Sequence, residues 1–151
     1  KLIELDPLTL KPLPGAEFAT LAQRFLLQSD PIIEAPHLLY RRGYFYLFMS
    51  FNHCCRGADT QYQVRVGRSR DIAGPYLDAN GWPLYLGGGT PLIARDGDYM
   101  GTGHSDLFSE NGQDWLVHHA KRADEDYRAY LHIRKLRWLT TGWPSLCAEP
   151  A

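Results

Sequence analysis

Turn-forming residues divide most of this chain into short segments, and their spacing is the feature that most restricts its fold. From His37 onward, turns containing Gly, Asn, Asp or Pro recur at intervals of roughly ten residues. The segments between them are rich in aromatic and aliphatic side chains and lack the period of about 3.6 residues that marks an amphipathic helix. This pattern predicts an all-β protein, built as a sandwich, a barrel or a propeller.

The chain also repeats one arrangement of strands. Residues 34–78 and 90–138 each hold about four predicted strands, close to the ~40–45 residues of a propeller blade. Segment 44–51 is apolar at nearly every position, as expected of a strand that is covered on both faces. The repeat therefore favours propeller blades over a sandwich. The predicted strands are residues 2–5, 37–40, 44–51, 61–69, 76–78, 91–94, 99–108, 115–120 and 129–138.

Three units are expected along the chain, amounting to about two to three blades. Residues 1–30 are expected to form the end of a middle blade and a linker, within which 20–28 fits a short helix or a strand equally well. Residues 31–86 form one blade, and residues 87–151, beginning at a run of three glycines, form the last blade. Such a stack leaves an apolar sheet face open at each end. We therefore expect the chain to pair with further blades or with a second copy of itself.

Net charge, the length of apolar runs and cysteine content give no support for several classes of function. Lys and Arg number 16 against 17 acidic residues, a net charge of −1, which gives no reason to expect nucleic acid or an anionic membrane as a partner. No apolar run approaches the roughly 20 residues of a transmembrane helix. Cys54, Cys55 and Cys147 are odd in number and two are adjacent, so we expect buried or half-buried thiols rather than a disulfide framework.

Glu34 is the first candidate for chemistry. It lies at the start of a predicted strand, between Ile33 and Ala35 and just before Pro36. A carboxylate among apolar residues loses hydration, which favours its protonated form and suits it to donate a proton. Because Pro36 cannot donate to a sheet ladder, this end of the strand is expected at an edge or a channel. The alternative is a surface glutamate at a junction between loop and strand.

Histidines offer a second kind of site. His104 follows two glycines in the segment 101–106 and precedes Ser105 and Asp106, a sparse set of ligands that fits a cation held mostly by water. The alternative is a core histidine bonded to the backbone. His118 and His119 are adjacent, so a strand turns their rings to opposite faces and packing is the better interpretation for them.

Several of these segments, in order, resemble glycoside hydrolase family 43. They are IleGluAlaProHisLeuLeuTyr at 33–40, CysCysArgGly at 54–57, ValArgValGlyArgSer at 64–69, GlyGlyGlyThr at 87–90, GlyThrGlyHisSerAsp at 101–106 and TrpLeuValHisHisAla at 115–120. The likeness covers nearly the whole chain, and the subgroup it resembles most is the endo-α-1,5-L-arabinanases.

The resemblance implies part of a five-bladed β-propeller that cleaves arabinan or arabino-oligosaccharides with inversion. It matches Glu34 to the general acid and His104 to a ligand of a cation, usually calcium, in the central channel. Cys54 and Arg56 match a loop beside the substrate groove. By analogy with relatives that degrade polysaccharides, the resemblance also implies an extracellular or periplasmic location.

The chain departs from the family in one important respect. The segments that carry the family's catalytic base and its acid-tuning aspartate have no counterpart in this sequence, and inversion needs two carboxyl groups about 6.5–9.5 Å apart. We therefore expect hydrolysis only when blades carrying those carboxylates are supplied, unless Asp30 or Asp106 replaces the base. The alternatives are an inactive carbohydrate-binding fragment, or an exo-acting arabinofuranosidase or β-xylosidase of the same family.

Overall fold

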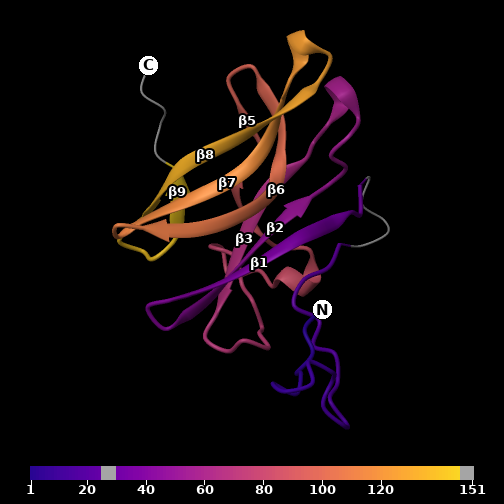
Figure 1. The fold of residues 1–151 in the computed structure, drawn as a ribbon, viewed down its shortest axis with the longest axis vertical. Helices are drawn as coiled ribbons and strands as arrows, with labels where there is room; N and C mark the ends of the chain where they lie inside the picture. Colours follow the sequence, from indigo (N-terminus) through magenta and orange to yellow (C-terminus); the bar gives the residue numbers. More distant parts are fainter. Residues whose placement is uncertain (25–29, 147–151) are drawn as a thin grey trace.

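The computed structural model describes residues 1–24 and 30–146 of the chain. Within them the protein is all-β, as predicted, with two antiparallel sheets of four and five strands (Figure 1). The short 3-10 helices η1 (Gly57–Asp59), η2 (Leu84–Leu86) and η3 (Ala123–Glu125) lie in the connections. None of the helical turns in the described part approaches the length and apolarity of a membrane-spanning helix.

The first sheet has the strand order β1-β2-β3-β4. Its strands are β1 (Ile33–Arg41), β2 (Tyr44–Phe51), β3 (Gln63–Ser69) and β4 (Thr90–Ile93). The turn between β1 and β2 places both central residues, Arg42 and Gly43, at positive φ (46° and 82°). Positive φ at both central residues is the signature of a type I′ two-residue hairpin, so this turn fixes the pairing of β1 with β2.

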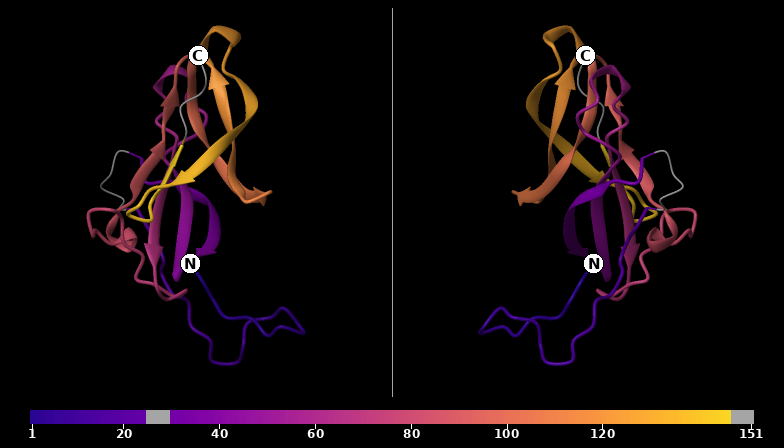
Figure 2. Two further views of the ribbon diagram at one scale, coloured as in Figure 1. Left: turned by 90° about the vertical axis from the view of Figure 1, so that its left-hand side faces the viewer. Right: turned by 90° about the vertical axis from the view of Figure 1, so that its right-hand side faces the viewer.

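The second sheet has the strand order β5-β6-β7-β8-β9. Its strands are β5 (Arg95–Asp96), β6 (Tyr99–Glu110), β7 (Gln113–Arg122), β8 (Arg128–Trp138) and β9 (Pro144–Leu146). Another two-residue hairpin, at Asn111 and Gly112 with φ of 50° and 77°, joins β6 to β7. Figure 2 shows the two sheets as separate layers that lean against each other.

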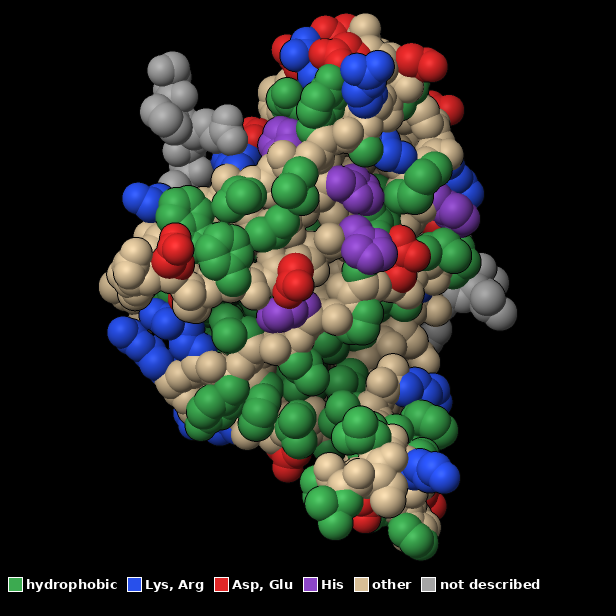
Figure 3. Space-filling model, in the orientation of Figure 1, with side chains coloured by type: hydrophobic (Ala, Val, Ile, Leu, Met, Phe, Trp, Pro, Cys, Tyr) green, Lys and Arg blue, Asp and Glu red, His purple; other side chains and the backbone are tan. Residues whose placement is uncertain are grey.

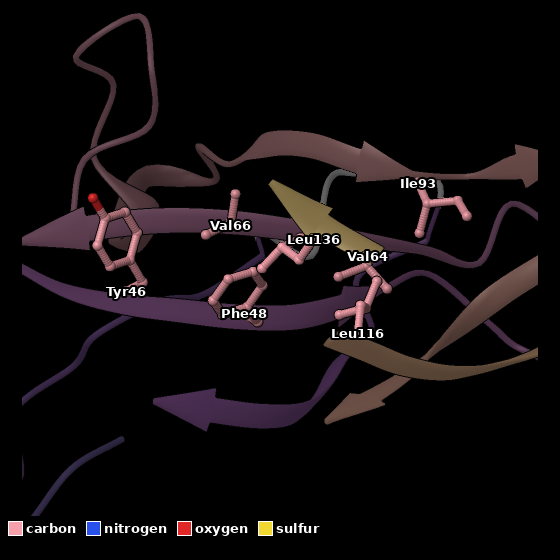
Figure 4. Packing of buried hydrophobic residues seen from close by; sticks show 7 residues of the cluster. All are labelled: Tyr46, Phe48, Val64, Val66, Ile93, Leu116 and Leu136. Carbon is pink, nitrogen blue, oxygen red and sulfur yellow. The ribbon is translucent and has the colours of Figure 1, made fainter. Parts of the chain in front are cut away.

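One apolar core joins the two sheets. Aromatic and aliphatic side chains from β2, β3 and β4 meet others from β7 and β8 (Figure 4). The cluster consists of Tyr46, Phe48, Val64, Val66, Ile93, Leu116 and Leu136. Its members are at most 8% exposed, so they bury enough apolar surface to hold the sheets together.

A second cluster covers the opposite face of β2. Leu47, Met49 and Phe51 pack there against Leu84, Tyr76 and Leu21. The six residues from Tyr46 to Phe51 are therefore all buried. This confirms the prediction that segment 44–51 is a strand covered on both faces.

Apolar side chains remain open to solvent at the two ends of the structure. The N-terminal residues 1–19 extend away from the sheets (Figures 1 and 2), and Leu8 and Phe18 are 92% and 63% exposed. On the outer face of β8, Leu131 and Ile133 are 72% and 54% exposed. Exposed apolar side chains of this kind are available for contact with another surface.

The structure corrects three predicted strands. Residues 91–94 were expected to open the last blade, but β4 instead pairs with β3 and completes the first sheet, with Ile93 opposite Val64. The strands expected at 2–5 and 76–78 are reduced to isolated bridges. Residues 20–24 form neither helix nor strand, and 25–28 lie outside the described residues.

Candidate active site

Glu34 lies near the start of β1, the strand at the edge of the first sheet. A bulge interrupts the pairing between Glu34 and His37, and Ala35 within it has a positive φ of 50°. A bulge at an edge accommodates Pro36, which has no N–H for the ladder. The expectation that this part of the strand lies at an edge is thus confirmed.

Glu34 is not buried in the structure, contrary to the expectation from its apolar neighbours in sequence. Glu34 is exposed, whereas its neighbours Ile33 and Ala35 are half-buried. It lines a hollow of about 410 Å³ whose other walls are mostly apolar, including Leu21 and Met49. Apolar neighbours in sequence therefore do not by themselves desolvate a carboxylate in a strand.

A buried tyrosine holds the carboxylate of Glu34 in place. The hydroxyl of Tyr62, just before β3, donates a hydrogen bond of 2.6 Å to Oε1 of Glu34. Tyr62 is only 1% exposed, and its ring stacks on His119 with centroids 5.5 Å apart and an interplanar angle of 14°. Burial, followed by the bond to the carboxylate of Glu34, raises the pKa of Tyr62 to about 12, so its hydroxyl remains a donor.

The glycines before His104 permit this packing. A Cβ on Gly103 would lie 2.0 Å from the Tyr62 ring, so no larger residue fits there without displacing the ring. Gly101 has a φ of 59° and lies against Thr60. The two bulges of β6 in this region place His104 at a φ of 53°, with its backbone N–H donating to Ser50 Oγ at 2.7 Å.

β1 and β6 together carry most of the polar candidates. His104 is exposed on β6, and His37 Nδ1 on β1 lies 2.6 Å from Oδ1 of Asp106 on β6. Figure 3 shows histidine and acidic side chains gathered near the middle of this face. In the described part of the chain, no group of three or more His, Cys, Asp or Glu side chains is arranged to hold a metal ion.

The loop after β2 contains a disulfide that the sequence analysis did not anticipate. Cys54 and Cys55 are bonded to each other, so the prediction of free thiols is wrong for both, while Cys147 lies outside the described residues. Lys121 on β7 donates to the carbonyl of Cys54 at 2.9 Å, and Thr60 donates to the same carbonyl at 3.2 Å. The loop is therefore fastened to the second sheet, beside the bulged part of β6.

Asp30 holds the same loop through contacts with His53. Its carboxylate is buried and accepts the backbone N–H of His53 at 2.8 Å, and the His53 ring Nδ1 lies 2.5 Å away. Burial opposes ionisation, but these bonds and the nearby guanidinium of Arg56, at 4.0 Å, hold the pKa of Asp30 below its usual value. Asp30 therefore supports the loop that carries Cys54 and Arg56.

Neither Tyr62 nor His53 was predicted from the sequence as part of this site, and Asp30 was considered only as a substitute base, not as a support for the loop. The bond from Tyr62 to Glu34 spans 28 positions, and that from His53 to Asp30 spans 23. Such contacts depend on strand register and leave no local pattern. The one available signal was Gly103, since a glycine inside a strand often marks a close approach of another group.

The family model and the relatives that match this chain point to one family of proteins. A family model described as glycosyl hydrolases family 43 matches residues 2–144. The chain is 37% identical over 153 positions to an extracellular exo-α-(1→5)-L-arabinofuranosidase of Cellvibrio japonicus, covering 97% of this chain and 44% of the relative. It is 39% identical over 145 positions to extracellular endo-α-(1→5)-L-arabinanase 1 of Bacillus subtilis, covering 96% of this chain and 42% of the relative.

Solved structures of similar proteins share the fold of this chain. An α-L-arabinanase of Cellvibrio cellulosa in complex with arabinohexaose superposes with a TM-score of 0.87 at 36% identity, covering 96% of this chain and 48% of that one. The family 43 endo-arabinanase of Bacillus licheniformis gives a TM-score of 0.81 at 38% identity, with coverages of 95% and 47%. The two sheets are therefore part of a five-bladed propeller, and the chain spans less than half the length of these relatives.

Proposed function

Because the chain belongs to glycosyl hydrolase family 43, we propose that it carries the general acid of an inverting enzyme that cleaves α-1,5-L-arabinofuranosyl bonds of arabinan. The observation that carries this proposal is the exposed carboxylate of Glu34, held in one orientation by the buried Tyr62. A fixed donor at a solvent-open edge strand suits protonation of the glycosidic oxygen as the bond breaks.

The second carboxylate must come from outside these residues. In inversion a base activates water on the opposite side of the sugar, about 6.5–9.5 Å from the acid. Asp30 is buried beneath His53, and Asp106 is bonded to His37, so neither of the substitutes considered from sequence is free for that role. We infer that N-terminal blades supply the base and pack against the apolar faces that this chain leaves open.

The loop beside Glu34 is proposed to contact the sugar chain. The side chain of Arg56 is 48% exposed and can donate to sugar hydroxyls, and Cys54 lies next to it on a loop fixed by Lys121. Arabinan or an arabino-oligosaccharide is the proposed substrate, since one structural relative was solved with arabinohexaose. The relatives include exo- and endo-acting enzymes, so exo action is the alternative within the same chemistry.

An extracellular location is proposed on two grounds. Two relatives carry the word extracellular in their names. The bond between Cys54 and Cys55 also suits an oxidising compartment, where disulfides persist.

Complementation tests the proposed function. The chain alone is expected to release no reducing sugar from linear arabinan above the blank. Fusion to the N-terminal half of the Bacillus subtilis relative should restore release, with the inverted β-anomer appearing first by proton NMR. Release by the chain alone would contradict the proposed division of carboxylates. A folded fusion that binds arabino-oligosaccharide without cleaving it would favour the carbohydrate-binding alternative.

We also propose that His104 provides one ligand to a hydrated calcium ion. The exposed imidazole fits such a role, and water or residues beyond this chain would provide the remaining ligands. Saturating calcium at 100 times its dissociation constant should add about 2.7 kcal/mol to the free energy of unfolding of the fusion. Chelator should remove this gain, and His104→Ala should abolish it. An unchanged melting temperature in chelator, with no metal by elemental analysis, would contradict the proposal.

A further inference from the structure

Arginines gather at the end of β1 that is remote from Glu34. Arg41 and Arg42 lie at the hairpin between β1 and β2, and Arg68 and Arg70 lie at or just after the end of β3. In Figure 3 a group of Lys and Arg side chains marks this edge of the molecule. Arg41 lies seven positions along β1 from Glu34, roughly 23 Å at about 3.3 Å per residue. The cluster is therefore distinct from the site of cleavage.

A hollow of about 360 Å³ opens within this cluster. Its walls come from the β1–β2 hairpin, β3 and the turn that follows β8. They comprise Arg41, Arg42, Tyr44, Tyr46, Arg68, Trp138 and residues 139–142. No acidic residue is among the described side chains that line it, and the hydroxyl-bearing Thr140 and Thr141 are.

The guanidinium groups of Arg41 and Arg68 are held in fixed positions. Arg68 lies between two rings, 4.6 Å from the centroid of Tyr44 and 4.4 Å from that of Trp143, and it donates to the carbonyl of Thr141 at 3.0 Å. Arg41 lies over Trp138 at 4.7 Å. Side chains that are ordered in advance lose little conformational entropy when a ligand binds.

The positive charge of this cluster is largely unbalanced. Among the described carboxylates, only Asp114 comes within ion-pair distance, at 3.3 Å from Nη1 of Arg41. Asp114 also accepts the indole N–H of Trp138 at 2.6 Å and a hydrogen bond from Ser109. The buried Nε of Arg41 has no hydrogen-bond partner in the described structure.

We propose that this hollow binds an oxyanion, either the carboxylate of an acidic sugar or a free inorganic anion such as phosphate. Arginine forks match the geometry of both groups, and the volume lies near the lower end of the ~300–1,000 Å³ typical of ligand sites. Only the choice of a sugar as the source rests on the proposed function. Binding here would hold the protein on an acidic part of a polysaccharide while Glu34 acts about one strand length away.

A titration of isotope-labelled protein tests the site without any assay of hydrolysis. The indole N–H signal of Trp138, which lines the hollow, should shift saturably with a galacturonic acid trimer, measured by NMR at constant ionic strength in the chain or in the fusion. Arabinotriose, which carries no charge, should cause no such shift. Shifts with phosphate alone would support a site for free oxyanions. Shifts with arabinotriose, or with none of the ligands, would overturn the proposal.

Two arginine variants make the test specific. Arg42→Gln removes an exposed guanidinium that lines the hollow, and it should weaken anion binding about tenfold. Arg70→Gln is the matched control, because Arg70 contacts Tyr44 but lines the neighbouring hollow instead. The affinity of the Arg70→Gln variant for the anion should stay within about twofold of that of the parent protein. Equal weakening of anion binding by both variants would indicate a diffuse basic surface and would contradict the proposal.

Discussion

Glu34→Gln in the fusion with N-terminal blades is expected to lower kcat on arabinan by about 10²–10⁴-fold, the range over which general acids contribute. The amide oxygen of the new side chain can still accept the hydrogen bond of Tyr62, so the local structure should persist. Removing only the transferable proton should leave the melting temperature nearly unchanged. Glu110→Gln, at the exposed hairpin between β6 and β7, is the control and should retain full activity.

The size of this loss should depend on the leaving group. A glycosidic oxygen of a sugar needs a proton as the bond breaks, whereas an acidic phenol leaves with little assistance. An aryl arabinofuranoside with an acidic phenol should therefore lose far less activity than arabinan in Glu34→Gln. An equal loss on both substrates would contradict the general-acid role and would indicate a role in binding or folding.

The sequence allowed the all-β class and most strands to be predicted because turns and apolar runs are local signals. β2 was clear since its aromatic and aliphatic run is bounded by the hairpin residues Arg42 and Gly43. β4 was placed in the wrong sheet because its four residues carry no signal of their partner. The return of the chain through Gly87 and Gly89, both at positive φ, brings β4 beside β3.

The residues of the candidate site also fall into those that a local motif indicates and those that only the tertiary structure brings into place. Glu34 and His104 were found because each lies in a distinctive local motif, whereas the positions of Tyr62 and Asp30 depend on tertiary structure. The bond between Cys54 and Cys55 was not predicted because adjacent cysteines rarely pair, and no local sequence pattern indicates the loop geometry that allows it. The exposure of Glu34 was not predicted because the position of the residue at the bulged edge of the sheet, not the character of its sequence neighbours, decides its exposure.

Gly103 provides the most demanding test of how the site is built. A Cβ there would lie 2.0 Å from Cε1 and 2.4 Å from Cδ1 of Tyr62, well inside van der Waals contact. The ring has little room to move, because it is buried and stacks on His119. Gly103→Ala should therefore lower the free energy of unfolding by about 1–3 kcal/mol, the usual cost of overpacking a core.

The same substitution should also disturb the acid. A displaced Tyr62 ring carries its hydroxyl away from Oε1 of Glu34, so Gly103→Ala in the fusion should lose activity as well as stability. Tyr62→Phe keeps the ring and removes only the hydroxyl. It should therefore lower activity with a smaller loss of stability, about 0.5–1.5 kcal/mol for one hydrogen bond.

A double-mutant cycle separates the steric cause from any general effect of a methyl group on β6. If the clash with Tyr62 is the reason for the loss, then adding Gly103→Ala to a Tyr62→Ala background should cost almost nothing, since the ring is gone. Denaturant unfolding of the parent, both single variants and the double variant measures the coupling, which we expect to be about 1–3 kcal/mol. Additive losses would mean that Gly103 is needed for another reason, and that the packing of β6 against Tyr62 does not set the position of Glu34.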